Sequence, residues 1–308
     1  MTVVEIYSHS IMNRYKSSLC TKASLFILIT LVLTFIPPLL IAYRSQGFWI
    51  TTNTYQEQPD VKFKKEAMII LDTPQPGGFF AWSTYSNFNS LLQQNLRIPS
   101  VKSTETDVNG DGKFDQLNFT AQFPLAASES ITSLQMILIF DFKLYRMSTF
   151  QMESLAYITF SSLTPGAKLT IFGDLRMYQK ISLRHRGTDT RFNTSIVNST
   201  SLFASDYDLT NILSSYSQRN VTTVYAPNYP IWKSGRGASQ PFTIEVIITY
   251  PTETITYTPG FWELIKWGWV QYVTILLLFL WVFKKINVAV FSSQVFQTIV
   301  ERPKLKQQ

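Results

Sequence analysis

Two long apolar runs without a formal charge constrain the fold of this 308-residue chain more than any other feature. They are residues 23–43 and residues 267–283, and each is bounded on both sides by Lys or Arg. A helix over residues 23–43 would be about 31 Å long, which is enough to cross the hydrocarbon core of a bilayer. The second run is close to the lower length limit, but its flanking lysines can extend toward the bilayer surface. The sequence therefore predicts two transmembrane helices that flank a domain over residues 44–266.

Two other interpretations of these runs are disfavoured. A cleaved signal peptide would have a shorter apolar run and a small-residue cleavage site, which does not follow residues 41–44. A buried helix of a soluble domain would have a polar face, and residues 275–280 have none. Aromatic residues cluster at both ends of the second run, as they do at the two surfaces of a membrane.

The formal charge of +7 comes mainly from outside residues 45–265. The basic residues flank the apolar runs, so the charge indicates a membrane protein and no nucleic-acid partner. Lys and Arg are more numerous before the first run and after the second run than on their inner sides. This asymmetry predicts a cytosolic N-terminus (1–22), a cytosolic C-terminal tail (284–308) and a lumenal or extracellular domain between the spans.

Cysteine and histidine are too scarce for most catalytic or metal sites. The chain has one cysteine, Cys20, and two histidines, His9 and His185. An intramolecular disulfide is impossible, and a zinc site of Cys and His would need more ligands. His185 lies between two arginines, which would oppose the imidazolium of a Ser-His-Asp site. The sequence predicts no catalytic residue, no cofactor-binding residue and no small-molecule substrate.

The region between the spans is predicted to be rich in β-structure. Alternating or apolar segments predict strands at residues 61–64, 117–123, 134–147, 168–172, 243–250 and 254–257. Residues 134–147 form either one strand or two strands joined by a bulge near Asp141. Clusters of Pro, Gly, Ser and Asn predict turns at residues 73–78, 164–166 and 225–230. Apolar residues at helical spacing predict a short helix over residues 208–219. The expected fold is an antiparallel, β-sandwich-like domain with a short helix.

Residues 107–115 match the first nine positions of a calcium-binding loop. The ligands would be side chains or, at the lysine, a backbone carbonyl: Asp107, Asn109, Asp111, Lys113 and Asp115. The twelfth position lacks the bidentate glutamate of such loops, and a strand follows instead of a helix. A structural calcium ion is therefore one interpretation, and a plain Asn-Gly/Asp-Gly hairpin turn is the other.

Two kinds of covalent modification are predicted. Asn-x-Ser/Thr sequons predict N-glycosylation of a lumenal domain at Asn118, Asn193, Asn198 and Asn220. Cys20 lies three residues before the first apolar run, where cysteines can be S-acylated. The alternative for Cys20 is a reduced, unmodified thiol.

The predicted spans contain few polar residues and no charged residue. The hydroxyl and amide side chains are those of Thr30, Thr34, Gln271 and Thr274. They could form hydrogen bonds with other helices, or the threonines could bond their own helix while Gln271 reaches the membrane surface. Spans without an ionisable group make a poor ion pathway.

Blocks along nearly the whole chain resemble one known family. They are SLCTKA (18–23), FIPPLL (35–40), RSQGFW (44–49), YQEQP (55–59), FAWST (80–84), NGDGK (109–113), DYDLT (206–210), RNVTTV (219–224), YTPGFWE (257–263), WVQYV (269–273) and FLWVF (279–283). Taken in order, they resemble the transmembrane protein 231 family of the ciliary transition zone. The tail after Lys285 resembles it least.

The resemblance implies a two-span subunit of the complex at the base of the cilium that contains the tectonic proteins and other Meckel-syndrome-associated subunits. That complex acts as a diffusion barrier that controls the protein composition of the ciliary membrane, ciliogenesis and Hedgehog signalling. The resemblance implies no reaction. From the residues alone, two other functions stay open: a cell-surface adhesion or receptor-type β-domain protein, and a membrane-anchored lumenal hydrolase that uses two carboxylates.

Overall fold

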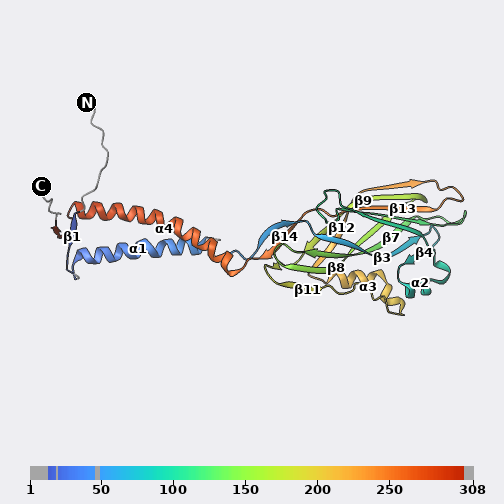
Figure 1. Ribbon diagram of the computed structural model, residues 1–308, viewed down its shortest axis with the longest axis horizontal. Coiled ribbons are helices and arrows are strands. Elements are labelled where there is room, and N and C mark those ends of the chain that lie inside the picture. Colours follow the sequence, from blue (N-terminus) through green and yellow to red (C-terminus); the bar gives the residue numbers. More distant parts are fainter. Residues whose placement is uncertain (1–12, 19, 46–48, 302–308) are drawn as a thin grey trace, which may run out of the picture. The chain divides into compact units, whose positions relative to one another are not determined.

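The computed structural model describes residues 13–18, 20–45 and 49–301, and the chain divides into two compact units. One unit contains residues 1–51 and 259–308, and the other contains residues 52–258 (Figure 1). Parts of the predicted cytosolic segments 1–22 and 284–308 lie outside the described residues.

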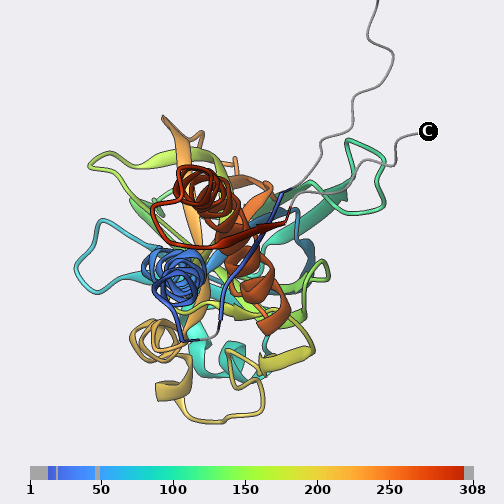
Figure 2. The ribbon, with the colours of Figure 1, turned by 90° about the vertical axis from the view of Figure 1, so that its left-hand side faces the viewer.

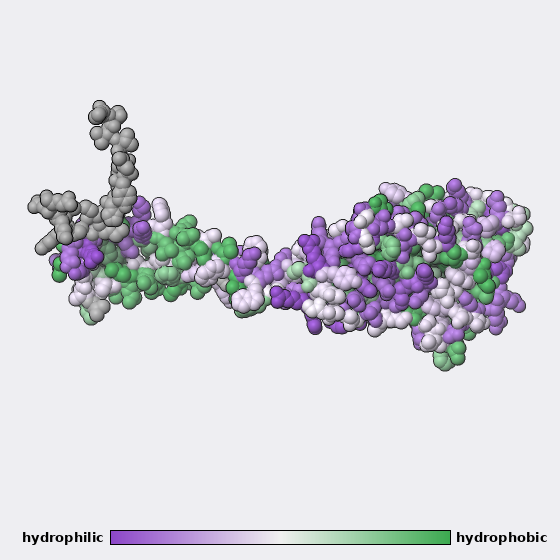
Figure 3. All heavy atoms as spheres, in the orientation of Figure 1, coloured by the Kyte–Doolittle hydropathy of each residue, from purple (hydrophilic) through white to green (hydrophobic). Residues whose placement is uncertain are grey.

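Two apolar helices, α1 (Lys22–Arg44) and α4 (Phe261–Ser292), form most of the first unit. They lie side by side, as both ribbon views show (Figures 1 and 2). The visible surface of the pair is mainly apolar along its length (Figure 3). Both helices are long and apolar enough to cross a membrane. The predicted span 23–43 falls within α1, whereas α4 extends beyond residues 267–283 at both ends.

Two short strands, one before α1 and one after α4, pair with each other. A capping box of Thr21 and Ser24 starts α1. Strand β1 (Arg14–Lys16) pairs with β15 (Ile299–Glu301), and the Lys16 ammonium lies 2.6 Å from the Glu301 carboxylate.

The second unit contains three β-sheets. In the first five-stranded sheet the spatial order is β11 (Thr188–Phe192), β8 (Thr149–Ser161), β7 (Ser133–Leu144), β3 (Asp60–Asp72) and β4 (Phe79–Ser83). In the second the order is β12 (Val221–Ser234), β9 (Gly166–Gln179), β13 (Phe242–Thr249), β6 (Gln116–Phe123) and β5 (Ser100–Thr106). A three-stranded sheet consists of β10 (Leu183–Arg184), β14 (Glu253–Thr258) and β2 (Asn53–Glu57).

The main core of this unit lies between the two five-stranded sheets. Alternate residues of each strand point inward, and Phe119, Phe140 and Phe242 are at most 1% exposed. Each sheet has one apolar face, and the two apolar faces pack against each other and so are removed from water. The predicted fold class is therefore confirmed: two apolar helices flank a mainly-β domain with a short helix.

A third layer covers the outer face of the first sheet. It contains α2 (Ser86–Leu92), the 3-10 turns η2 (Gln93–Asn95) and η3 (Ala204–Tyr207), and α3 (Leu209–Ser217). A second apolar cluster, which includes Phe88, Leu155, Tyr207 and Ile212, lies beneath these helices. The predicted helix 208–219 corresponds to α3, where the Asp208 carboxylate accepts from the Thr210 N–H.

Of the two alternatives for residues 134–147, the single strand is confirmed, and the irregularity lies on the neighbouring strand. β7 runs through Asp141 without interruption, while β3 shifts register between Phe63 and Glu66. Lys65 there has a φ of 61°. Without the bulge, the alternation that places Phe63 in the core would also point Lys65 inward, so the bulge removes a charge from the core.

Two further expectations need correction. The predicted turn at 225–230 lies within β12, because β12 is an edge strand whose outer side needs no ladder hydrogen bonds and therefore tolerates prolines. A register shift between Pro227 and Tyr229 accommodates them. The sheets are also not purely antiparallel, since β13 pairs with β9, and β11 with β8, in parallel.

Candidate functional site

The chain enters and leaves the β-rich unit on two neighbouring strands. β2 and β14 pair in antiparallel fashion, with Asn53 opposite Tyr257. The rings of Tyr55 and Tyr257 pack with centroids 5.6 Å apart. Residues 259–260 separate β14 from α4. The domain is thus connected to both helices through one pair of strands.

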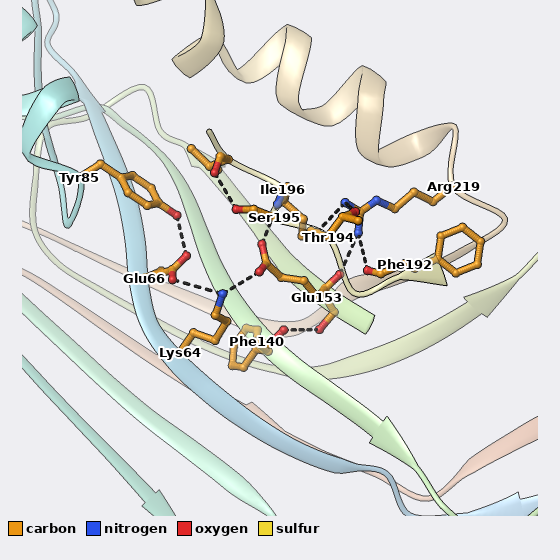
Figure 4. A network of polar contacts seen from close by, with 12 residues as sticks. Lys64, Glu66, Tyr85, Phe140, Glu153, Phe192, Thr194, Ser195, Ile196 and Arg219 are labelled. Carbon is orange, nitrogen blue, oxygen red and sulfur yellow. Dashed lines mark hydrogen bonds and ion pairs between the residues drawn. The ribbon is translucent and has the colours of Figure 1, made fainter. Parts of the chain in front are cut away.

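A buried polar network fastens the third layer to the first sheet (Figure 4). Glu153 on β8 is 5% exposed; its Oε2 lies 2.6 Å from Lys64 Nζ, and its Oε1 accepts from the Ile196 N–H at 2.7 Å. Glu66 lies 3.3 Å from the same ammonium and accepts from the Tyr85 hydroxyl at 3.0 Å. Burial opposes the charge of Lys64, but its hydrogen bond to Glu153 and the two carboxylate charges outweigh burial and raise its pKa.

Arg219 completes this network from the end of α3. Its Nη1 donates to the carbonyls of Glu153 and Phe192 at 3.1 Å, and its Nη2 donates to the Thr194 carbonyl at 3.0 Å. The guanidinium carbon lies 5.4 Å from the centre of the Tyr216 ring. Burial lowers the pKa of Arg219. One side chain therefore joins β8, the segment after β11 and the end of α3.

The network contains two carboxylates, as a carboxylate hydrolase would need, but both are paired with the same lysine. Glu66 and Glu153 flank Lys64, and both form ion pairs with it. Both carboxylates are occupied by this ammonium and by groups of the third layer or of the segment leading to it, so the arrangement suits packing of the layers. Two surface hollows at residues 73–79 are each lined by a single carboxylate, Asp72 in one and Glu129 in the other.

The β5–β6 loop contains the predicted calcium ligands Asp107, Asn109, Asp111, Lys113 and Asp115. Their oxygens bind the loop's own backbone: Asp107 accepts from two N–H groups at 2.7 and 2.9 Å, and Asp115 from two at 2.8 and 3.1 Å. Lys113 Nζ donates to the Gln58 carbonyl. A hydrogen bond from Gln58 and the backbone N–H groups lower the pKa of Asp115. Within the described residues, no group of three or more Asp, Glu, His or Cys side chains is arranged to bind a metal.

Three of the predicted glycosylation sites are exposed. Asn193, Asn198 and Asn220 lie in the segments before and after α3. Asn118 is partly exposed on β6, between the buried residues Leu117 and Phe119, and so faces the outer side of the second sheet. Glycans at the first three sites would gather beside the third layer.

Two contacts set the register of α1 against α4. Ser45 Oγ donates to Gln271 Oε1 at 2.5 Å, and the rings of Phe26 and Phe291 lie 6.1 Å apart. Because these contacts are separated by nearly equal lengths of helix, the helices run antiparallel at a constant register. Residues 31–32 of α1 are consequently level with residues 284–285 of α4.

The polar residues of the spans mostly bond their own helices. Thr30 and Thr34 are buried, and their hydroxyls donate to the carbonyls of Ile27 and Thr30. Thr274 donates to the Gln271 carbonyl. Cys20 is exposed just before α1, where it is accessible to an acylating enzyme.

The sequence itself decides the family. A family model described as transmembrane protein 231 matches residues 1–300. The chain belongs to the transmembrane protein 231 family. The resemblance inferred from the sequence blocks is confirmed, and the family's name denotes a membrane protein rather than an enzyme.

Relatives in the transmembrane protein 231 family match over nearly their full length. The Xenopus tropicalis protein is 52% identical over 300 residues, covering 97% of this chain and 96% of the relative. The Gallus gallus protein is 51% identical over 307 residues, covering 99% and 96%. The Homo sapiens protein is 48% identical over 300 residues, covering 97% and 95%.

A solved proton-activated chloride channel aligns with 87% of this transmembrane protein 231 chain and 98% of the channel chain. The sequence identity is 11% and the TM-score is 0.27, which is too low for the likeness to bear on fold or function.

Sequence reasoning missed two features of this transmembrane protein 231 chain. The network of Lys64, Glu153 and Arg219 joins residues far apart in the sequence, and nothing in their local patterns signals it. The second is the continuation of α4 past Lys284 and Lys285 to Ser292. A signal did exist there, because apolar residues continue past the lysines at 286–291.

Proposed function

We propose that this chain is a structural membrane subunit of the ciliary transition-zone complex, together with tectonic proteins and further transmembrane subunits. It would help to form the diffusion barrier that controls ciliary membrane composition, and so affect ciliogenesis and Hedgehog signalling. Membership of the transmembrane protein 231 family over residues 1–300 is the observation that carries the proposal.

The physical character of the chain supports a scaffold without a catalytic step. The candidate acid–base pair, Glu66 and Glu153, is bound to Lys64 and serves packing. The second sheet of the domain exposes its outer face, and only residues 259–260 separate β14 from α4 in the sequence. These features suit assembly with neighbouring subunits.

The proposal includes a topology with both termini cytosolic and a glycosylated outer domain. Arg14, Lys16 and Lys22 lie at one end of the helix pair, against Arg44 and Lys266 at the other. This excess, with Lys284 and Lys285 after the predicted second span, supports a cytosolic location for the Lys22 end. S-acylation of the exposed Cys20 and a structural calcium ion at residues 107–115 are secondary proposals.

The function is tested by replacing the predicted second span, residues 267–283, with an unrelated apolar helix of equal length in ciliated cells. The outer domain should still fold, while co-purification with tectonic proteins and retention at the ciliary base should fall. The unaltered chain provides the reference. If that unaltered chain were spread over the whole cell surface and absent from the ciliary base, the proposal would fail in favour of a cell-surface β-domain protein.

A further inference from the structure

A row of apolar side chains on the outer face of the second sheet starts beside the sequon at Asn118. Asn118 on β6 lies opposite Ile247 on β13. Phe172 on β9 is next to Ile247, and Tyr229 on β12 is next to Phe172. Phe172 is 37% exposed and Tyr229 is 71% exposed, so nothing in the described part of the chain covers them. These three apolar residues are called the outer row below.

Polar side chains border the outer row along both of its long sides. On one side Glu245 lies 2.5 Å from Lys168 and accepts a hydrogen bond from the Thr170 hydroxyl at 3.2 Å. On the other side the Asp174 carboxylate accepts a hydrogen bond from the Thr249 hydroxyl. Each carboxylate keeps lone pairs that can accept further hydrogen bonds. An apolar strip between polar borders matches a sugar ring, whose faces carry C–H groups and whose edge carries hydroxyls.

The attachment atom of a glycan is free at Asn118. Asn118 Oδ1 accepts from the Gln116 side chain at 3.3 Å, whereas Nδ2, the atom that carries an N-glycan, has no hydrogen bond within the described residues. Neighbouring strands are about 4.8 Å apart, so the outer row begins about 5 Å from Asn118 and ends about 14 Å from it. One sugar is about as long as one strand spacing, so the first three sugars can cover the row. In the other direction only Thr104 on the edge strand β5 adjoins Asn118.

We propose that Asn118 carries an N-glycan whose first sugars lie across the sheet on the outer row. Because the glycan is tethered beside this row, its local concentration there exceeds that of any free ligand. The inference rests on the proposed function for an outer domain that is glycosylated. It also deepens that function, because the glycan leaves only the rest of the outer face to neighbouring subunits.

The first test treats the folded full chain in detergent with endoglycosidase and follows each site by glycopeptide mass spectrometry. The glycan at Asn118 should be released at least about tenfold more slowly than the glycan at Asn193, because its sugars must first leave the sheet. Chains unfolded before treatment should lose both glycans at the same rate.

Variants of the outer row show whether it causes the slow release. Phe172→Ser with Tyr229→Ser should remove most of the difference between the two sites. Tyr229→Ser alone should remove part of it, and this change at a 71% exposed side chain should leave the fold intact. Tyr178→Ser is the matched control, because Tyr178 is 55% exposed on the same face but lies outside the outer row.

The second test measures how far the glycan covers the two aromatic rings. Thr120→Val removes the sequon and leaves Asn118 in place, whereas Thr120→Ser keeps the sequon and is the control. Hydroxyl-radical labelling of Phe172 and Tyr229 should rise severalfold in the valine variant only. Tyr145, which is 50% exposed and follows β7 of the first sheet, should be labelled equally in both variants.

Three results would overturn the inference: no glycan at Asn118, release from Asn118 as fast as from Asn193, or unchanged labelling in the Thr120→Val variant. A glycan at Asn193 with none at Asn118 would contradict this inference and leave the proposed topology standing. A chain whose Asn118 glycan covers the outer row, but which is absent from the ciliary base, would contradict the proposed function alone.

Discussion

Lys64 Nζ lies 2.6 Å from Glu153 Oε2, although 89 positions separate the two residues in the sequence. The bulge at Lys64 and Lys65 turns this part of β3 away from the main core, and Lys64 then reaches across β7 to β8. Glu153 also binds the Ile196 N–H, so the ion pair positions the segment that leads to α3.

Glu153→Gln should lower the free energy of unfolding by about 2 kcal/mol, because it removes a charge-assisted hydrogen bond and places an amide against an ammonium. Lys64 is 26% exposed, so water partly compensates the loss. Denaturant unfolding of the full chain in detergent measures the change. Hydrogen exchange of the Ile196 amide should accelerate in parallel.

Glu245→Gln is the matched control for that substitution. It breaks the Lys168–Glu245 pair, which is just as short at 2.5 Å but has side chains 37% and 35% exposed. Solvent screening should keep its effect below about 1 kcal/mol. Equal losses in the two variants would show that burial does not determine the strength of the Lys64–Glu153 pair.

The Lys65→Gly variant should have a free energy of unfolding about 1 kcal/mol higher than that of the Lys65→Ala variant. The reason is that Lys65 has a φ of 61°, which glycine adopts more readily than alanine. Both variants remove the same exposed charge, so their difference isolates the backbone conformation. Thermal unfolding of the two chains compares them. A more stable alanine variant would contradict the left-handed bulge.

Lowering the pH should destabilise the conformation of the β5–β6 loop. Hydrogen bonds from Gln58 and the backbone N–H groups place the pKa of Asp115 below its ordinary value of 3.8 in the folded chain. The stability they contribute is therefore present above that value and is lost as pH falls through the lower, folded-state pKa. Asp115→Asn should remove this acid dependence and destabilise the chain by about 1 kcal/mol at neutral pH.

The same loop tests the calcium proposal. If calcium binds there, millimolar calcium should raise the unfolding temperature of the full chain relative to chelator, and Asp107→Ala with Asp111→Ala should abolish that difference. Substitution of Asp206 and Asp208, outside the loop, is the control. An unchanged unfolding temperature would favour the plain hairpin turn.

Glycosylation should occur mainly at Asn193, Asn198 and Asn220, which are exposed in loops. Each Asn→Gln change at one of these sites should remove one glycan. The gel mobility shift that endoglycosidase treatment produces should then become smaller by one step. Asn118→Gln should have the smallest effect because Asn118 is only partly exposed on a strand. Cleavage of the outer domain by a protease on the cytosolic face of sealed vesicles would refute the topology itself.

The sequence alone determined the features that depend on local patterns. Two apolar runs predicted α1 and α4, because lipid requires about twenty apolar residues in a row. Alternating residues predicted β6 and β13, because one face of each strand is buried. The spacing of apolar residues after Asp208 predicted α3. Family membership also follows from the sequence, since matching blocks preserve their order.

Only the tertiary structure decided which residues meet. The two-residue bulge, the parallel β9–β13 pair and the bonds of Lys64, Glu153 and Arg219 join segments far apart in the chain. The register of α4 against α1 likewise depends on contacts between distant residues, Ser45 with Gln271 and Phe26 with Phe291. Such pairings arise from the packing of whole faces, and local residue patterns specify which face is buried without specifying what lies against it.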